Sequence, residues 1–300
     1  MLLQQIINGL TLGAVYALIA LGYTMVYGIL GLINFAHGEI YMVGAYAGII
    51  TLAFLTVAGL TSQYLILSLL IVFIVAMLVC GSYGATMERV AYRPLRHAPR
   101  LSPLISAIGM SIFLQNYVML TQGSADKIFP HILPNEPWVF LGVTLTPIQM
   151  FIILNSLVLM AALHFFINRT RMGKAMRATA QDKRMASLVG IPVDTVISVT
   201  FVIGSILAAA AGVMVAMYYG LINFYMGYVA GIKAFTAAVL GGIGNIPGAV
   251  LGGFLLGIVE SLGAAYISSE YKDAFAFILL ILLLIFKPSG LLGERVPDKV

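Results

Sequence analysis

Four ionisable side chains stand inside long apolar blocks of this sequence, where a charge is costly to bury and often has a function. They are His37 and Glu39 in the first third of the chain, and Lys233 and Glu260 in the last third. Asn34 precedes the first pair, and we expect its side chain to cap the helix that follows. One interpretation is structural, with the Glu39 carboxylate near the positive end of that helix. The other is that Asn34, His37 and Glu39 form a broken segment that lines a route or a gate.

Lys233 and Glu260 flank a glycine-rich hairpin. Its Gly-Asn-Ile-Pro-Gly stretch at residues 244–248 predicts a turn rather than a helix interior. Non-helical backbone at membrane depth survives only when it is buried in protein or lines a cavity. Glu260 either faces a partner subunit or a water-filled cavity, or it pairs with Lys233 and closes the hairpin. The candidates for an interface or a pathway in the turn are Gly244, Asn245 and Gly248.

One long helix-forming segment, Gly173–Pro192, is basic rather than apolar. Read as a single helix, it has a face of mostly small residues beside a basic face, and Asp182 has no opposite charge three or four residues away. In so apolar a chain, a short helix of this kind is typical of an element that docks onto a soluble partner. The residues that we expect to make or support the docking are Lys174, Arg177, Ala178, Asp182, Ala186 and Gly190.

Catalytic and metal-binding patterns do not occur in the sequence. It contains no G-x-x-x-x-G-K-[ST] phosphate loop and no H-E-x-x-H motif. The four histidines are scattered without metal-ligand spacing, and the single Cys80 has no histidine nearby. We therefore expect no enzyme activity, no metal site and no cofactor. A proton-coupled secondary transporter, with His37, Glu39 and Glu260 as relays, is a second interpretation.

The composition is that of a membrane protein. Hydrophobic residues make up 61% of the 300 residues and charged residues only 9%, with a mean hydropathy of +1.03. We predict an all-α integral membrane protein of about eight transmembrane helices, since each needs about 20 apolar residues. The final pass, around Ala274–Phe286, is short. The first apolar block lacks a positive n-region and an evident cleavage site, so we expect a retained helix.

The positions of the positive charges predict the topology. Thirteen of the sixteen Lys and Arg fall within Arg89–Arg100, within Arg169–Arg184 and in the tail from Lys287. By the positive-inside rule these three regions, including the C-terminus, are cytoplasmic. The proline-containing loop Gln122–Thr146 and the N-terminus then lie outside.

The same count constrains the glycine-rich hairpin. Gly231–Ser269 must cross the membrane an even number of times to keep the tail inside. Two full passes barely fit in that length, so we predict a re-entrant or broken hairpin around Gly241–Gly248.

An internal repeat accompanies this topology. Gly31–Phe35 (GLINF) recurs as Gly220–Phe224, each time after a Tyr-containing apolar helix. The first copy is predicted to end inside and the second outside. This is the pattern of the inverted repeats that are common in transporters, and the alternative is a chance match of five residues.

The longest motifs resemble those of the LivH-type permeases of bacterial branched-chain amino-acid ABC importers, and the resemblance runs over nearly the whole chain. The basic segment is similar to that family's R-A-x-A-x-D…A…G-I cytoplasmic segment, here Arg177–Ile191. The other motifs are Asn34–Glu39 (NFAHGE), Glu88–Leu95 (ERVAYRPL), Ser106–Asn116 (SAIGMSIFLQN) and Lys233–Gly248 (KAFTAAVLGGIGNIPG).

The resemblance implies one transmembrane permease domain over residues 1–300 in the bacterial inner membrane, with a cytoplasmic docking segment at residues 169–192. It implies a second, LivM-like permease, two ATPase subunits that contact Lys174–Ile191, and a periplasmic protein that delivers leucine, isoleucine or valine. Nucleic acid is not expected as a partner. Pro192, where many relatives have a polar residue, should sharpen the helix stop. Alternating access is the mechanism that fits, and a related permease for urea, short amides or another amino acid is the alternative.

Overall fold

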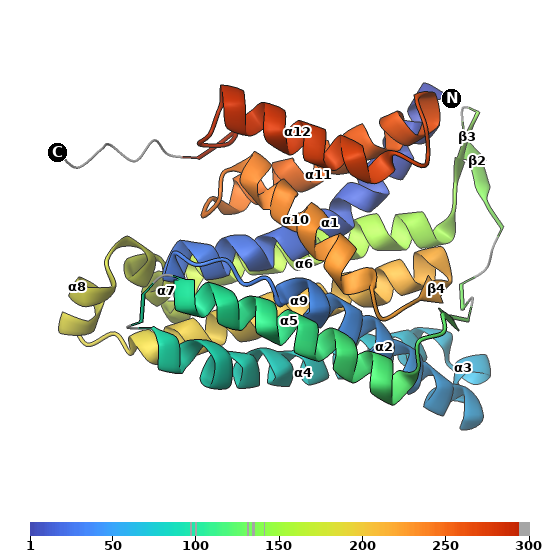
Figure 1. Cartoon of the computed structure of the whole chain (residues 1–300). Coiled ribbons are helices and arrows are strands. Elements are labelled where there is room, and N and C mark those ends of the chain that lie inside the picture. Colours follow the sequence, from blue (N-terminus) through green and yellow to red (C-terminus); the bar gives the residue numbers. More distant parts are fainter. Residues whose placement is uncertain (97, 100, 131, 134–135, 141, 294–300) are drawn as a thin grey trace.

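The computed structural model describes residues 1–96, 98–99, 101–130, 132–133, 136–140 and 142–293 (Figure 1). Part of the predicted cytoplasmic tail, residues 294–300, therefore lies outside the described residues. The first half contains α1 (Leu2–Leu30), α2 (His37–Val57), α3 (Leu60–Gln63), α4 (Leu65–Met87), the π-helix η1 (Glu88–Tyr92), the 3₁₀ turn η2 (Arg93–Leu95), α5 (Leu101–Gln122), β1 (Lys127–Ile128), β2 (Trp138–Phe140) and β3 (Val143–Leu145). The second half contains α6 (Pro147–Arg169), α7 (Arg171–Gln181), α8 (Lys183–Leu188), α9 (Val193–Tyr219), β4 (Leu221–Ile222), α10 (Met226–Gly241), α11 (Ile246–Tyr266) and α12 (Lys272–Phe286).

The long helices lie side by side, so the molecule has two ends (Figure 1). α7 and α8 lie at one end, here named the α8 end. The short strands, α3 and the N-terminus lie at the opposite end, here named the strand end. α1 and α9 are apolar around their whole circumference and are buried in the centre, whereas α5 and α6 bury only a narrow stripe.

The expectation of an all-α membrane protein is confirmed. Among the described residues, seven helices are long and apolar enough to span a membrane: α1, α2, α4 with its continuation through η1 and η2, α5, α6, α9 and α11. α10 and α12 are apolar but have only 16 and 15 residues. This part of the chain thus has seven full-length spans, against an expectation of about eight helices that included the short final pass, here α12.

Both copies of the GLINF repeat interrupt the helical run in the same way. Gly31 caps the end of α1 with φ 69° and Gly220 caps the end of α9 with φ 67°, a left-handed conformation that glycine adopts without strain. A short non-helical segment follows each glycine, and the next helix begins with a backbone bond to the repeat asparagine. His37 N donates to Asn34 O at 3.0 Å, and Met226 N donates to Asn223 O at 3.3 Å. Since α1 and α9 run in opposite directions (Figure 1), the two copies are inverted relative to one another.

The glycine-rich hairpin is a pair of helices, α10 and α11, joined by a turn at the α8 end. Within it, α11 is long enough for a full span, while α10 is short because the broken segment of residues 220–225 precedes it. The chain is therefore interrupted before α10, in addition to the turn at residues 242–245 where we predicted the break.

α2 and α10 cross at a contact made by glycines, beside the Glu39 side chain. A Cβ at position 38 would stand 2.7 Å from the Cα of Gly231 and closer still to the carbonyl oxygen of Gly227. A Cβ at position 227 would stand 2.8 Å from the carbonyl oxygen of Gly38. Gly38 and Gly227 occupy equivalent positions, each seven residues after the glycine that opens its repeat. The two halves of the molecule therefore touch backbone to backbone at this point.

We expect Gly38→Ala to lower the stability of the purified protein by about 1–3 kcal/mol or more, because the added methyl group meets backbone that cannot rotate away. Gly109→Ala on α5 is the matched control, since no atom lies within 4 Å of a Cβ there. The control should be neutral or slightly stabilising, because alanine favours a helix more than glycine does. Thermal unfolding in detergent measures both, and equal melting temperatures would contradict the tight crossing.

Candidate functional site

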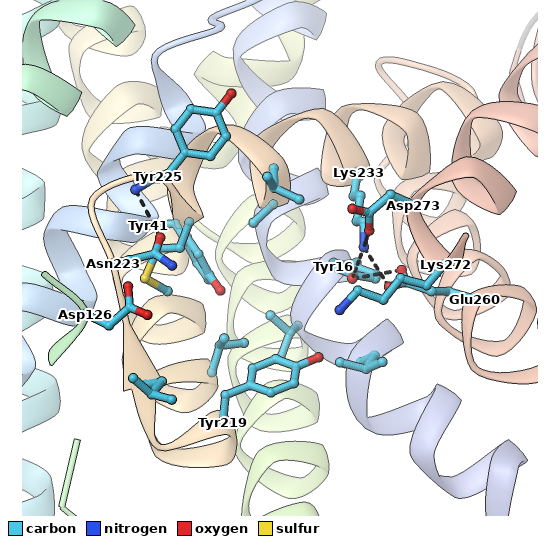
Figure 2. A pocket seen from close by; sticks show the side chains of 17 residues that line it. Tyr16, Tyr41, Asp126, Tyr219, Asn223, Tyr225, Lys233, Glu260, Lys272 and Asp273 are labelled. Atoms are coloured by element: carbon cyan, nitrogen blue, oxygen red, sulfur yellow. Dashed lines mark hydrogen bonds and ion pairs between the residues drawn. The ribbon is translucent and has the colours of Figure 1, made fainter. Parts of the chain in front are cut away.

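A cavity of about 500 Å³ lies near the strand end between α1, α9, α10, α11 and α12 (Figure 2). Its volume falls in the range of small-molecule sites. One part of its wall is apolar and comes from α1, α9 and α10, and other parts carry charged side chains. The lining includes Leu12, Val15, Tyr16, Asp126, Tyr219, Val229, Lys233, Glu260, Lys272 and Asp273.

A buried ion cluster forms one side of this cavity. The Lys233 ammonium on α10 lies 2.6 Å from Glu260 Oε1 on α11 and 2.6 Å from Asp273 Oδ1 on α12. The Tyr16 hydroxyl on α1 donates to Glu260 Oε2 at 2.9 Å. The side chains of Lys233 and Glu260 are 6% and 4% exposed, whereas that of Asp273 is 48% exposed. Four helices therefore meet at one lysine.

The predicted pairing of Lys233 with Glu260 is thus present, but it is only part of the cluster. Tyr16 and Asp273 were not predicted, because each lies far from Lys233 in sequence. The one available signal was the pair Lys272 and Asp273, adjacent charges at the start of an otherwise uncharged helix.

Asn34, His37 and Glu39 all lie in the interior, away from the cavity lining, and their side chains face different elements, with the His37 ring against Tyr23 of α1. Asn34 Oδ1 accepts from the Tyr92 hydroxyl at 2.7 Å, and Glu39 Oε1 accepts from Ser111 Oγ on α5 at 3.0 Å. The predicted capping role of Asn34 is wrong: Ala36 is the N-cap of α2, and no side chain caps that helix. The Asn34 side chain instead turns toward the π-helix η1, which brings Tyr92 within reach.

These three residues are buried and incompletely bonded. Their side chains belong to residues only 1–2% exposed. Asn34 Nδ2, His37 Nε2 and Glu39 Oε2 have no hydrogen-bond partner among the described residues. Buried polar groups usually have hydrogen-bond partners. These three residues are therefore unusual, because each keeps one polar atom free to form a further hydrogen bond. The structure keeps them separate from Glu260, with which we had grouped them.

The basic segment is two helices rather than one. α7 ends at Gln181, Asp182 is extended (φ −154°, ψ 110°), and α8 begins at Lys183. Asp182 Oδ1 accepts from the backbone N–H of Arg184 at 2.8 Å and of Met185 at 3.0 Å. Asp182 is therefore the N-cap of α8, and the continuous small-residue face that we predicted does not form. An aspartate strongly prefers this position, which explains the break.

Both helices are tied to the transmembrane bundle. Arg177 donates to the Ile167 carbonyl at the end of α6, and Lys183 Nζ donates to the Leu30 carbonyl at the end of α1 at 3.1 Å. Partial burial and the charge of Arg96 lower the pKa of Lys183 below its ordinary value. α8 stops where predicted, with Gly190 at φ 85° and Ile191 N donating to Ala186 O at 3.0 Å.

The outward surface of the basic segment combines charge with apolar side chains. Lys174, Arg177, Asp182 and Gly190 are exposed, Ala178 is half-buried, and Ala186 is buried against the bundle. Met185, Leu188 and Val189, of which only Val189 belongs to the expected small-residue face, are 62%, 73% and 76% exposed. Their spacing on a short helix was not visible while the segment was read as a single helix.

The turn of the glycine-rich hairpin lies beside α7. Asn245 accepts from Gly248 N at 2.9 Å and donates to Leu292 O at 2.8 Å, so it caps α11 and holds the chain after α12. A groove of about 370 Å³ separates the turn from Arg177. Gly244, Asn245 and Gly248 therefore lie at the α8 end, far along the bundle from the cavity. Among the described residues, no three His, Cys, Asp or Glu side chains gather in a way that could hold a metal ion.

Comparison with known proteins identifies close relatives. The family described as "Branched-chain amino acid transport system / permease component" matches residues 5–284. The chain is 53% identical to the high-affinity branched-chain amino acid transport system permease protein LivH of Escherichia coli (strain K12), over 99% of this chain and 97% of the relative. It is 52% identical to LivH of Salmonella typhimurium over the same shares. It is 53% identical to the permease protein BraD of Pseudomonas aeruginosa, over 99% of this chain and 98% of that protein.

We expect Glu260→Gln to lower stability by about 3 kcal/mol, because it leaves a buried ammonium with one carboxylate fewer. Asp194→Asn is the matched control: Asp194 pairs with Arg93 at 2.8 Å and also with Arg96, but its own side chain is 57% exposed and Arg96 keeps Glu88 as a second partner. Its loss should cost about 1 kcal/mol or less. Thermal unfolding of the two purified variants tests this, and an equal loss in both would contradict the importance of burial.

Proposed function

Because this chain belongs to the family of branched-chain amino acid transport permeases, we propose that it is the transmembrane permease subunit of an ABC importer for leucine, isoleucine and valine. The observation that carries the proposal is the 52–53% identity over 99% of the chain to permeases of high-affinity branched-chain amino acid systems. The seven apolar helices fit a multi-pass protein of the inner membrane. The chemistry of this chain is then passage and conformational coupling, while partner subunits hydrolyse ATP.

α8 and the exposed side of α7 form the proposed contact with the two ATPase subunits. Met185, Leu188 and Val189 offer an apolar surface outside the bundle, and such a surface is stabilised when a protein partner covers it. Lys174 and the exposed side of Arg177 surround it with positive charge. Asp182, Ala186 and Gly190 support the shape of the segment, with Ala178 packed beneath it. On this proposal the α8 end is cytoplasmic.

The hydrogen bonds of the basic segment offer a route by which a conformational change in the ATPase subunits is transmitted to the transmembrane helices. Lys183 holds the carbonyl of Leu30, the residue before the first broken segment. That segment leads directly into Asn34, His37 and Glu39. A displacement of α8 by the ATPases would therefore move the broken segment and its incompletely bonded cluster. We assign this cluster to the gate of an alternating-access mechanism.

The remaining partners follow from the two ends of the molecule. A periplasmic binding protein would deliver the amino acid to the strand end, where the cavity with Glu260 opens. A second, LivM-like permease would cover part of the exposed apolar helix surface. Gly244, Asn245 and Gly248 contribute on the cytoplasmic side, where the turn lies against the groove beside Arg177.

We expect Leu188→Asp to abolish ATP-dependent uptake of radiolabelled leucine and co-purification of the ATPase subunits, in cells that depend on this chain for import. Burying a new carboxylate in the contact is costly. Leu188→Met keeps the apolar surface and should retain both activities. If the wild-type chain restores no leucine uptake with its partner subunits present, the proposed function is wrong. If Leu188→Asp still transports and still binds the ATPases, only the proposed contact is wrong.

Two substitutions at Asp182 separate a bracing role from a charged contact with the ATPase. Asparagine caps a helix as well as aspartate does, so Asp182→Asn should retain nearly normal leucine uptake. Alanine removes the cap at a cost of about 0.5–2 kcal/mol, so Asp182→Ala should reduce uptake at an unchanged level of the protein in the membrane. Equal loss in both variants would instead indicate that the charge itself meets the partner.

A further inference from the structure

We propose that the cavity at the strand end holds the transported amino acid in its zwitterionic form. In this arrangement the ligand ammonium lies against the carboxylates of the ion cluster, its carboxylate binds Lys272, and its side chain packs on the apolar wall. This inference rests on the proposed function and specifies where, within this chain, the amino acid binds.

The charge of the ion cluster favours an additional cation. Lys233 carries one positive charge and faces two carboxylates, Glu260 and Asp273. The formal charge of the three groups is therefore −1, in a site where Lys233 and Glu260 are almost fully buried. It remains −1 for the whole cavity lining, because Lys272 and Asp126 add one charge of each sign. Asp273 is half exposed and stands at the cavity surface. An ammonium group placed there would balance the charge and supply hydrogen bonds to the carboxylates.

Lys272, which lies next to Asp273 on α12, supplies a positive charge for the carboxylate of the ligand. It lines this cavity and a neighbouring one of about 330 Å³ that shares the wall formed by Tyr219 and Glu260. Figure 2 shows its side chain reaching into the cavity, near Glu260 and Tyr219. It is not the lysine of the ion cluster, so its ammonium remains available for a ligand carboxylate. Lys272 and Asp273 both line this cavity, so an ammonium and a carboxylate from α12 meet the same space.

The apolar wall of the cavity favours a ligand with a branched aliphatic side chain. Leu12 and Val15 from α1 and Val229 from α10 line the cavity beside the charged cluster. An amino acid with a polar side chain would lose hydration there without gaining hydrogen bonds. A ligand with only one charged end would leave either the carboxylates or Lys272 without its complement.

The single cysteine of the chain makes this testable by chemical protection. Cys80 is buried, and a Cys80→Ala background with Val229→Cys places the only thiol on the cavity wall. We would reconstitute this variant with its partner subunits in liposomes and measure its rate of modification by a water-soluble thiol reagent. Leucine and valine should slow the modification, whereas 3-methylbutylamine and 4-methylpentanoate, each lacking one charged end, should not.

Lys272→Met in the same background should raise the leucine concentration for half-protection roughly 10- to 100-fold, the effect of losing one charge-assisted hydrogen bond. Lys287→Met, at the far end of α12, is the matched control and should leave this concentration unchanged.

Three results would overturn the proposal. Leucine could fail to slow modification in liposomes that still accumulate it, which would remove the cavity from the route and leave the proposed function intact. The amine or the acid could protect as well as leucine does, which would exclude a zwitterion site. Lys272→Met and Lys287→Met could shift protection equally, which would exclude a direct role of Lys272.

Discussion

The backbone contact between Gly38 and Gly227 fixes the geometry on which the other features depend. A helix pair separated by ordinary side chains stands 8–10 Å apart, and this crossing is closer because neither residue has a Cβ. The close approach holds the starts of α2 and α10 against one another, directly after the two broken segments. It therefore sets the relative position of the two non-helical stretches, in which Asn34, Ala36 and Ile222 are buried.

The buried charges are organised around the same crossing. His37 and Glu39 flank Gly38 on α2, and Lys233 lies two turns into α10. One cluster is incompletely bonded, whereas the other is held by contacts from three further helices. The two therefore differ in how many neighbouring helices hold their charged groups. The Lys183 bond to Leu30 adds a third point of attachment, because it joins α8 to the chain just before the first broken segment.

The helices, the repeat and the basic segment could be predicted from the sequence, because apolar runs, glycine turns and charge clusters are local signals. The pairing of Lys233 with Glu260 could also be predicted, since few buried charges were available to pair. The partners Tyr16, Tyr92 and Asp273 could not be predicted, because residue spacing along the chain does not show which distant helices pack together. The break at Asp182 was missed for a different reason. A helical wheel assumes that the segment is one uninterrupted helix. The sequence alone does not distinguish an aspartate that caps a new helix from one on the face of a continuous helix.

The small sheet between β1 and β4 joins the loop after α5 to the second broken segment. Lys127 and Ile128 pair with Ile222 and Leu221, and Phe129 N donates to Gly220 O at 2.9 Å. Asp126 and Leu221, on the two sides of this seam, both line the cavity. The rim of the cavity is thus formed by residues from both halves of the chain. A displacement of the loop after α5 is therefore transmitted through this sheet to the segment that forms the opposite side of the cavity rim.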